Sequence, residues 1–359
     1  MKIKYNTVKF LVATLVLLMV VPSVQAGNKD RIGSNGGEQL KINPWGRSGS
    51  YGNANSASVF GVEATFLNVS GLAMTKKMDV SFNYSSWLGG SGVGINSLGY
   101  AQRVGEYAVI AAGFQSMDFG DIYKTTTDLP DDAGTFDAQY GTFFLSYARE
   151  FSNSIYAGFT TKVVTEGISN AKASAVAFDF GIRYVTGEND NIKFGIALKN
   201  IGGQLQFTGD GLSTKTSIDG KEFTVSQRTQ AVELPSILNM GLTYDILVGE
   251  LKDSEETGIR ATHRISPAFN FMSNSFGKDQ MSLGVEYAYR EFIMFRAAYL
   301  YEDKITDTSL NSIAYTGPSA GVTVAIPVNK TGSSLDVDYG FRATRSFSGI
   351  HTIGLRLNL

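Results

Sequence analysis

Hydrophobic residues alternate with polar or small residues along many short segments of this chain. In residues 175–185, AVAFDFGIRYV, one parity holds Val176, Phe178, Phe180, Ile182 and Tyr184, and the other holds Ala177, Asp179, Gly181 and Arg183. A period of two indicates a β-strand with one apolar face and one polar face. In a soluble sandwich the apolar face would pack on a core, whereas in a membrane barrel it would face lipid. The arrangement of all the strands has to decide between them.

The same alternation predicts fourteen strands. They lie at residues 78–88, 92–103, 106–118, 139–151, 154–166, 174–186, 190–200, 234–247, 256–266, 280–290, 292–302, 313–327, 333–345 and 349–359. An even number suits a single-chain barrel with both termini on the periplasmic side. The connections after the second, fourth, sixth, tenth and twelfth strands look short, and those after the third, fifth, seventh, ninth and eleventh look mostly longer, notably 119–138 and 201–233. Tight turns at one end and long loops at the other are typical of outer-membrane barrels. Two connections depart from this rule: the one after the eighth strand is longer, and the first loop is shorter, than it predicts.

The polar faces of these strands are rich in Gly, Ala and charges of both signs. An exposed strand of a soluble protein is weakened by so much Gly, whereas a crowded barrel interior needs small residues and pairs its charges across the lumen. We therefore predict that the apolar faces, including Val176 to Tyr184, contact outer-membrane lipid. The charged residues predicted to face the lumen are Asp179, Arg183, Lys193, Lys199, Asp245, Glu286, Asp336 and Arg342.

The amino terminus is typical of a secretory signal peptide. Lys2, Lys4 and Lys9 precede an apolar run at 10–21, and Val24-Gln25-Ala26 suits cleavage after residue 26. The alternative, a membrane-anchor helix, would need a longer run. The whole chain has 31 basic and 33 acidic residues and no Cys. Loss of three signal lysines makes the mature chain more acidic, which argues against a nucleic-acid partner. The absence of Cys excludes disulfides and thiolate metal sites.

Residues 27–77 do not alternate, and they are rich in Gly, Ser and Asn. Such a composition would also suit an exposed linker, but this segment carries too many apolar residues for a solvated tail. We predict three regions: a signal peptide at 1–26, a hatch or plug segment at 27–77, and a transmembrane barrel at 78–359. The part at 43–73 is expected to lie inside the lumen and close it. Its expected anchors are Asn43, Pro44, Trp45, Asn68, Gly71 and Leu72.

Catalytic and metal-binding patterns are weak. His263 and His351 are far apart and have no ligand-spaced neighbours. The stretch GGSGVG at 89–94 lacks the Lys and helix of a phosphate loop. An acidic stretch with Asp128, Asp131, Asp132 and Asp137 could bind calcium, but it lacks calcium-loop spacing and favours a solvated surface loop. We predict no catalytic residues, no metal, no cofactor and no enzymatic activity.

Several stretches carry a family resemblance. GVEATFLNVSGLA at 61–73 and the preceding WGRSGSYGNANSASV resemble the opening of the PorV/PorQ family, FadL-like outer-membrane proteins of the Bacteroidetes type IX secretion system. The later stretches SMDFGDI, FSNSIYAGFTTKVVTEGISN and KFGIALKNIGGQLQFTGDGLS are also similar, so the resemblance covers nearly the whole mature chain. Val69 departs from the family, which usually has Pro there, and this loosens the turn expected after Asn68.

The resemblance implies an all-β fold, a FadL-like fourteen-stranded antiparallel barrel in the cell outer membrane with an N-terminal lumen plug. It further implies an accessory role in type IX protein secretion, in which long extracellular loops bind the C-terminal signal domains of secreted cargo proteins or translocon components. Two alternatives stay open. One is a FadL-like channel for hydrophobic small molecules, against which the charged lumen argues. The other is a soluble β-domain.

Overall fold

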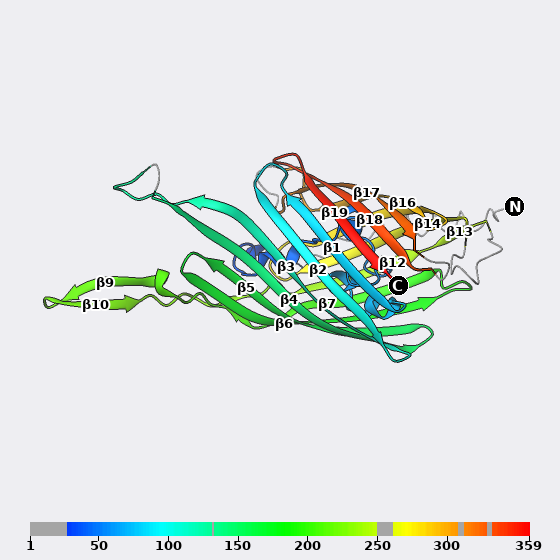
Figure 1. Cartoon of the computed structure of the whole chain (residues 1–359), viewed down its shortest axis with the longest axis horizontal. Coiled ribbons are helices and arrows are strands. Elements are labelled where there is room, and N and C mark those ends of the chain that lie inside the picture. Colours follow the sequence, from blue (N-terminus) through cyan, green and yellow to red (C-terminus); the bar gives the residue numbers. More distant parts are fainter. Residues whose placement is uncertain (1–26, 131–132, 250–260, 308–311, 329–331) are drawn as a thin grey trace.

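A computed structural model describes residues 27–130, 133–249, 261–307, 312–328 and 332–359. Within these residues the sheet closes on itself as a barrel of fourteen antiparallel strands (Figure 1). The barrel strands are β1 (Met78–Trp87), β2 (Val93–Val104), β3 (Ala108–Tyr123), β4 (Thr135–Ser152), β5 (Ile155–Ile168), β6 (Ala171–Thr186), β7 (Ile192–Gly202), β12 (Ile237–Tyr244) with its continuation β13 (Ile246–Val248), β14 (His263–Asn274), β15 (Gln280–Tyr289), β16 (Ile293–Glu302), β17 (Tyr315–Pro327), β18 (Ser334–Thr344) and β19 (Ile350–Asn358). Each strand pairs with its neighbours in the chain, and β19 pairs with β1 to close the ring.

The apolar faces of the strands lie on the outside of the barrel. Along β6, the five apolar residues from Val176 to Tyr184 are each 41–56% exposed, whereas Ala177 between them is fully buried. A belt of exposed Phe, Tyr, Leu and Ile around a closed barrel is what a lipid bilayer requires. The fourteen-strand prediction and the inverted orientation of the faces are both confirmed.

The ninth predicted strand was wrong in its position. We expected 256–266, whereas β14 runs from His263 to Asn274, and residues 256–260 lie outside the described part. Pro267 made the second half of this strand look like a loop. It pairs with Val285 on one side, and on the other it lies where the pairing to β12 stops and the pairing to β13 begins. A proline without an N–H is tolerated at such a break in the ladder.

The connection after the fifth strand was expected among the longer ones, but it contains only Ser169 and Asn170. Both flanking strands extend further than the pattern indicated. Ala171, Ala173 and Ala175 occupy the inward positions of β6 there, so the segment lacks the large apolar residues that mark a strand. The long connections between β3 and β4 and between β7 and β12 emerge at the same end as this turn, which we call the loop end. The opposite end is the turn end, and it also carries the connection between β13 and β14.

At the loop end, the connection between β7 and β12 folds into structure of its own. It contains β8 (Gln204–Leu205) paired with β11 (Val232–Glu233), a short helix η4 (Asp210–Leu212), and a hairpin of β9 (Ser213–Ile218) and β10 (Lys221–Ser226). Asp219 and Gly220 form the hairpin turn, and both have positive φ. The hairpin projects away from the barrel (Figure 1).

The N-terminal segment lies within the ring of strands (Figure 1). It contains η1 (Lys29–Arg31), η2 (Glu38–Lys41), α2 (Gly46–Ser50), α3 (Ala64–Leu67) and η3 (Val69–Met74). Arg31 bonds to Glu233 at the loop end, and the carbonyl of Thr75 accepts from Arg103 next to the β2–β3 turn. The segment therefore runs the length of the barrel. No helix among the described residues is long and apolar enough to cross a membrane.

Candidate functional site

The N-terminal segment approaches the inner wall of the barrel closely at several glycines of the strands. A Cβ added to Gly284 would lie 2.5 Å from the Tyr51 ring, and one added to Gly340 would lie 2.5 Å from the carbonyl oxygen of Gly46. The other wall glycines in such contact are Gly321 against Ser50, Gly241 against Ser56 and Ala57, Gly195 against Ala57 and Asn68, Gly181 against Asn68, and Gly99 against Val62. Residues 46–57 thus follow the wall from β18 round to β7.

We refer to residues 43–73 as the inner segment. Polar bonds attach its backbone and side chains to the wall. Asn83 of β1 accepts from the Gly46 N–H at 3.0 Å, and Ser56 donates to Asn270 at 2.5 Å. Tyr51 donates to the carbonyl of Ser266, and burial raises the pKa of this phenol. These bonds satisfy irregular backbone and polar groups that would otherwise be buried without partners.

The six residues expected to anchor the inner segment are placed as follows. Asn43 bonds within the segment, to the Trp45 N–H and to Asn53, and the carbonyl of Pro44 accepts from Ser85. Trp45 and Leu72 are buried in an apolar cluster with strands β2 to β6. Asn68 caps η3 through Ser70 and donates to the carbonyl of Ile182. Gly71 lies so close to Val59 and Arg183 that a Cβ would clash with both.

The eight charged residues expected in the lumen all lie on inward-facing positions, and seven of them are buried, with Lys193 half-buried. Lys193 forms an ion pair with Asp245, and Lys162 forms one with Asp179. Lys199 lies over the Phe66 ring at 4.1 Å, and Arg342 lies over the Tyr315 ring at 3.7 Å. Most of these charges therefore bond to other charged groups or lie over aromatic rings.

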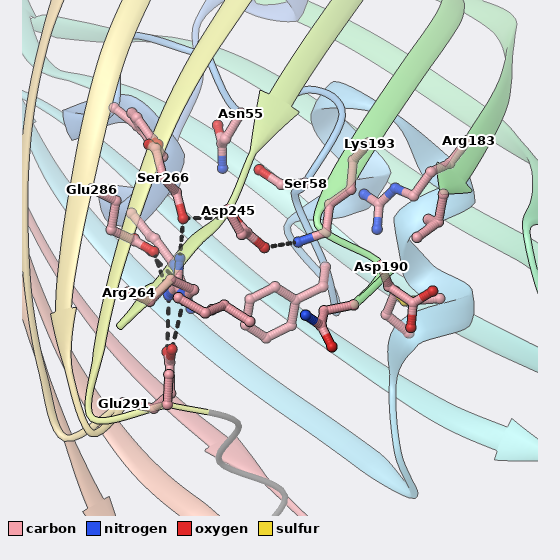
Figure 2. A pocket seen from close by; sticks show the side chains of 18 of the residues that line it. Asn55, Ser58, Arg183, Asp190, Lys193, Asp245, Arg264, Ser266, Glu286 and Glu291 are labelled. Carbon is pink, nitrogen blue, oxygen red and sulfur yellow. Dashed lines mark hydrogen bonds and ion pairs between the residues drawn. The ribbon is translucent and has the colours of Figure 1, made fainter. Parts of the chain in front are cut away.

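A cavity of about 380 Å³ remains between the inner segment and the wall at the turn end. Figure 2 shows charged side chains from β6, β7, β14 and β15 that surround it. Glu286 accepts from Arg264 at 2.8 Å and also binds Arg296, while Arg47 of the inner segment lies 3.5 Å away. Arg264 bonds in addition to Glu291, at 2.6 Å. One carboxylate is thus shared by three guanidinium groups.

Glu63 of the inner segment also lines this cavity. It is 6% exposed and accepts from the Ser48 hydroxyl at 2.9 Å. Burial raises the pKa of Glu63, although Arg47 and Arg356 oppose the shift. Desolvation disfavours the charged carboxylate, so burial is the larger effect here.

Of the lumen charges Arg183 and Asp336, Arg183 bonds to the backbone of the inner segment, and Asp336 has no such bond among the described residues. Arg183 donates to the carbonyl of Val59. Asp336 is buried, but its Oδ1 has no hydrogen-bond partner among the described residues. The residue that does reach the hatch from that side is Arg356, which donates to the carbonyl of Phe60 at 3.4 Å. Asp336 pairs in register with Arg356, so the two inward side chains lie at the same level of the barrel.

The sequence analysis missed Asp79 and Arg356. Arg356 donates to Asp79 through Nε at 2.8 Å and through Nη2 at 2.6 Å, and both side chains are buried. This bidentate pair joins β1 to β19 at the seam that closes the barrel. The inward parity of Arg356 was visible in the last strand, but its partner lies 277 residues away in sequence.

Two further cavities are present. One of about 570 Å³ lies at the loop end, lined by polar side chains that include Tyr140, Glu166 and Gln204. Another, of about 20 Å³, lies among Trp45, Phe66 and other mainly apolar side chains. In the described part of the chain no group of three or more His, Asp or Glu could hold a metal ion. Asp131 and Asp132 of the acidic loop lie outside it.

The sequence matches no protein-family model. It also matches no curated protein. Solved structures do share its architecture. The toluene transporter TodX of Pseudomonas putida is 11% identical, with a TM-score of 0.50 over 84% of this chain and 93% of that one. The toluene transporter TbuX of Ralstonia pickettii is 13% identical, with a TM-score of 0.48 over 83% and 94%. A FadL homologue of Pseudomonas aeruginosa is 12% identical, with a TM-score of 0.46 over 88% and 97%. At such identities the likeness to TodX shows a common fold.

Proposed function

We propose that this protein is an exported outer-membrane barrel that passes small hydrophobic molecules, with the inner segment closing the lumen at rest. The exposed apolar belt supports placement in a membrane, and the signal-peptide pattern at 1–26 supports export. TodX, which has the same fold, is a toluene transporter. A monoaromatic hydrocarbon is therefore the first substrate to test.

The observation that carries this proposal is the way in which the inner segment fills the barrel. Along β7 to β18 it contacts the wall mainly through glycines and hydrogen bonds, with a small apolar cluster of Tyr51 and Ala54 against Ala268 and Ala298. Water can replace such polar contacts at little net cost in free energy. The two larger cavities are lined by polar and charged groups, so passage of a hydrophobic molecule requires the inner segment to shift.

The charges in the lumen argue against a hydrophobic substrate. This objection is weaker once the contacts of those charges are known. Lys193 is bonded to Asp245, and Glu286 is bonded to three arginines. Paired charges are held in the wall and do not each need to face the path. The remaining obstacle is the inner segment itself.

The test is uptake of labelled toluene by Gram-negative cells whose lipopolysaccharide leaflet slows unaided entry. Cells that carry the protein should take up toluene faster than cells with an empty vector, and deletion of 43–73 should raise steady ion current in planar bilayers. Deletion of the hairpin 213–226 serves as the matched control and should leave uptake unchanged. Uptake at the empty-vector rate, with the barrel folded and in the outer membrane, would overturn the proposal.

A second candidate function is an accessory role in type IX protein secretion. The family resemblance suggests it, while the comparisons favour the channel. The structural feature that supports it is the β9–β10 hairpin at the loop end. Every residue of β10 is exposed, and the strand includes the exposed apolar side chains Phe223 and Val225. A projecting polar hairpin with free edges suits contact with a protein partner such as a cargo signal domain or a translocon component.

Co-purification from the native outer membrane tests this candidate. The deletion should cover 213–226 only, because Leu205, Leu234 and the partly buried Val232 at the base of the loop pack in an apolar cluster of the barrel. The control keeps the length and the Asp219-Gly220 turn but scrambles the two strands. Loss of a partner in both variants supports the secretion role, whereas recovery of the same partners in both excludes the hairpin as the binding surface.

A further inference from the structure

The cavity at the turn end is lined by an arginine side chain, Arg183, that has no carboxylate partner among the described residues. Arg183 is 2% exposed, and its side chain forms no salt bridge among the described residues. The guanidinium donates to the neutral carbonyl of Val59, and its Nε has no hydrogen-bond partner in the described part of the chain. Figure 2 shows this side chain at the edge of the cavity, near Lys193.

A buried guanidinium without a counter-charge is costly, because its desolvation is not offset by an ion pair. The acidic residues that the structure describes around the cavity do not supply that charge. Asp245 is bonded to Lys193 and Ser266, and Glu286 and Glu291 are both bonded to Arg264. Glu63 accepts from Ser48, and Asp190 in the β6–β7 turn has contacts of its own.

The other cations that line the cavity have carboxylate partners. Arg47 and Arg264 both contact Glu286, Arg264 also binds Glu291, and Lys193 binds Asp245. Among the described residues, Arg183 is therefore the lining cation without such a partner. The cavity of about 380 Å³ is large enough for a small anion with its remaining water. A planar guanidinium matches the oxygen pairs of carboxylate and phosphate groups.

We propose that this cavity is an oxyanion site, in which Arg183, assisted by Arg47, binds a carboxylate or phosphate group that enters from the turn end. The site goes beyond the passage of hydrophobic molecules and does not depend on it. Occupation would give Arg183 the counter-charge that the described residues do not provide. It would also compete with the Val59 carbonyl for the guanidinium, and so act on the inner segment at residue 59.

The experiment measures thermal unfolding of the purified, detergent-solubilised full-length protein in a chloride buffer of constant ionic strength, with inorganic phosphate, acetate or perchlorate added. Phosphate or acetate should raise the unfolding temperature with saturation, and perchlorate, a poor hydrogen-bond acceptor, should not. A preference between phosphate and acetate identifies which oxyanion class the site takes. Heat-modifiable mobility shows that each sample is folded.

Arg183→Gln should weaken the apparent affinity for the preferred anion about tenfold to a hundredfold, as expected for the loss of a charge-assisted contact. Arg183→Lys should retain part of it. Arg342→Gln is the matched control, because it removes another inward arginine that lies outside the cavity, and its affinity should equal that of the unsubstituted protein. If Arg183→Gln does not fold, Arg47→Gln with Arg183 intact provides the second test. No saturable shift in the unsubstituted protein, or equal shifts in all variants, would overturn the site, and neither result bears on toluene uptake.

Discussion

Replacement of Gly340 by Ala should release the inner segment from the wall. A Cβ at this position would lie 2.5 Å from the carbonyl oxygen of Gly46 and 3.2 Å from its carbonyl carbon. Favourable contact begins at about 3.5 Å, so Gly46 must retreat by roughly 1 Å. The strand cannot yield instead, because β18 is paired on both sides, to β17 and to β19. Gly46 begins the five-residue helix α2, so we expect the helix rather than the strand to move.

Overpacking of this size typically costs about 1–3 kcal/mol. If the cost falls on docking of the inner segment, the ratio of undocked to docked protein rises by roughly 5-fold to 150-fold. The free energy of barrel unfolding should change less, since the strand pairing is untouched. The expected result is an increase in the time spent in a conducting state.

Planar-bilayer recording provides the measurement. The unsubstituted protein should carry little steady current, Gly340→Ala should open intermittently, and deletion of 43–73 should give a sustained current as the upper reference. Gly167→Ala is the matched control, because a Cβ there meets only Lys172 at 3.8 Å. A folded Gly340→Ala protein as silent as the control would refute the reasoning, as would a large stable current in the unsubstituted protein.

Three further predictions concern stability. Asp79→Asn deprives Arg356 of its buried carboxylate and should lower the free energy of unfolding by about 3–5 kcal/mol. Urea titration followed by heat-modifiable mobility measures this change. A loss below ~1 kcal/mol would contradict a structural role for the pair. Because the pKa of Glu63 is raised, the folded protein binds this proton more tightly than the unfolded chain does. The stabilisation from this group is therefore complete at low pH and declines as pH rises from about 4.3 through the raised pKa. Glu63→Gln should flatten that part of the dependence of unfolding free energy on pH, and an unchanged dependence would show that another group is responsible. Deletion of 213–226 should change the unfolding free energy by less than about 0.5 kcal/mol because the hairpin is exposed, whereas Leu205→Ala, at a fully buried position, should cost about 2–5 kcal/mol; equal losses would mean that the hairpin supports the barrel.

The strand count and the orientation of each face could be predicted from the sequence, because both depend on a period that is local to each strand. Val176 is exposed on the outer face of the barrel, whereas its neighbour Ala177 is buried. The alternation of apolar and polar or small residues is enough to predict this difference. The ninth strand was misplaced because it contains a proline, which usually indicates the end of a strand. Pro267 is acceptable only because the neighbouring ladder is interrupted at that level, and the sequence of one strand does not reveal a gap in another.

The partners of the inward charges could not be predicted. Asp79 and Arg356 meet only when the first and last strands close the ring in one register. Likewise, Asp336 and Arg356 lie on neighbouring strands at the same level, and the side chain that reaches the carbonyl of Phe60 is the longer one. Inward parity identifies a lumen charge, whereas its bonds depend on strand register and on the path of the inner segment. That Arg183 lacks a counter-charge among the described residues is visible only once the pairs around it have been assigned.

The two parts of the inner segment are held to the wall by different forces, and this difference predicts which part moves. Residues 62–73 bury Val62, Leu72 and Ala73 against β2 to β6, in the apolar cluster that also receives Trp45. Exposing that cluster to water would forfeit roughly 1.5–3 kcal/mol for each large side chain. Residues 46–57 have mainly glycine contacts and hydrogen bonds, which water can replace, and a smaller apolar cluster of Tyr51 and Ala54 with Ala268 and Ala298. Local opening begins where the fewest apolar contacts are lost. We therefore expect 46–57 to swing away from β7 to β18 while 62–73 stays in place, so that amide hydrogen exchange is faster at 46–57 than at 62–73. Equal protection of the two stretches would mean that the inner segment moves as a unit or not at all.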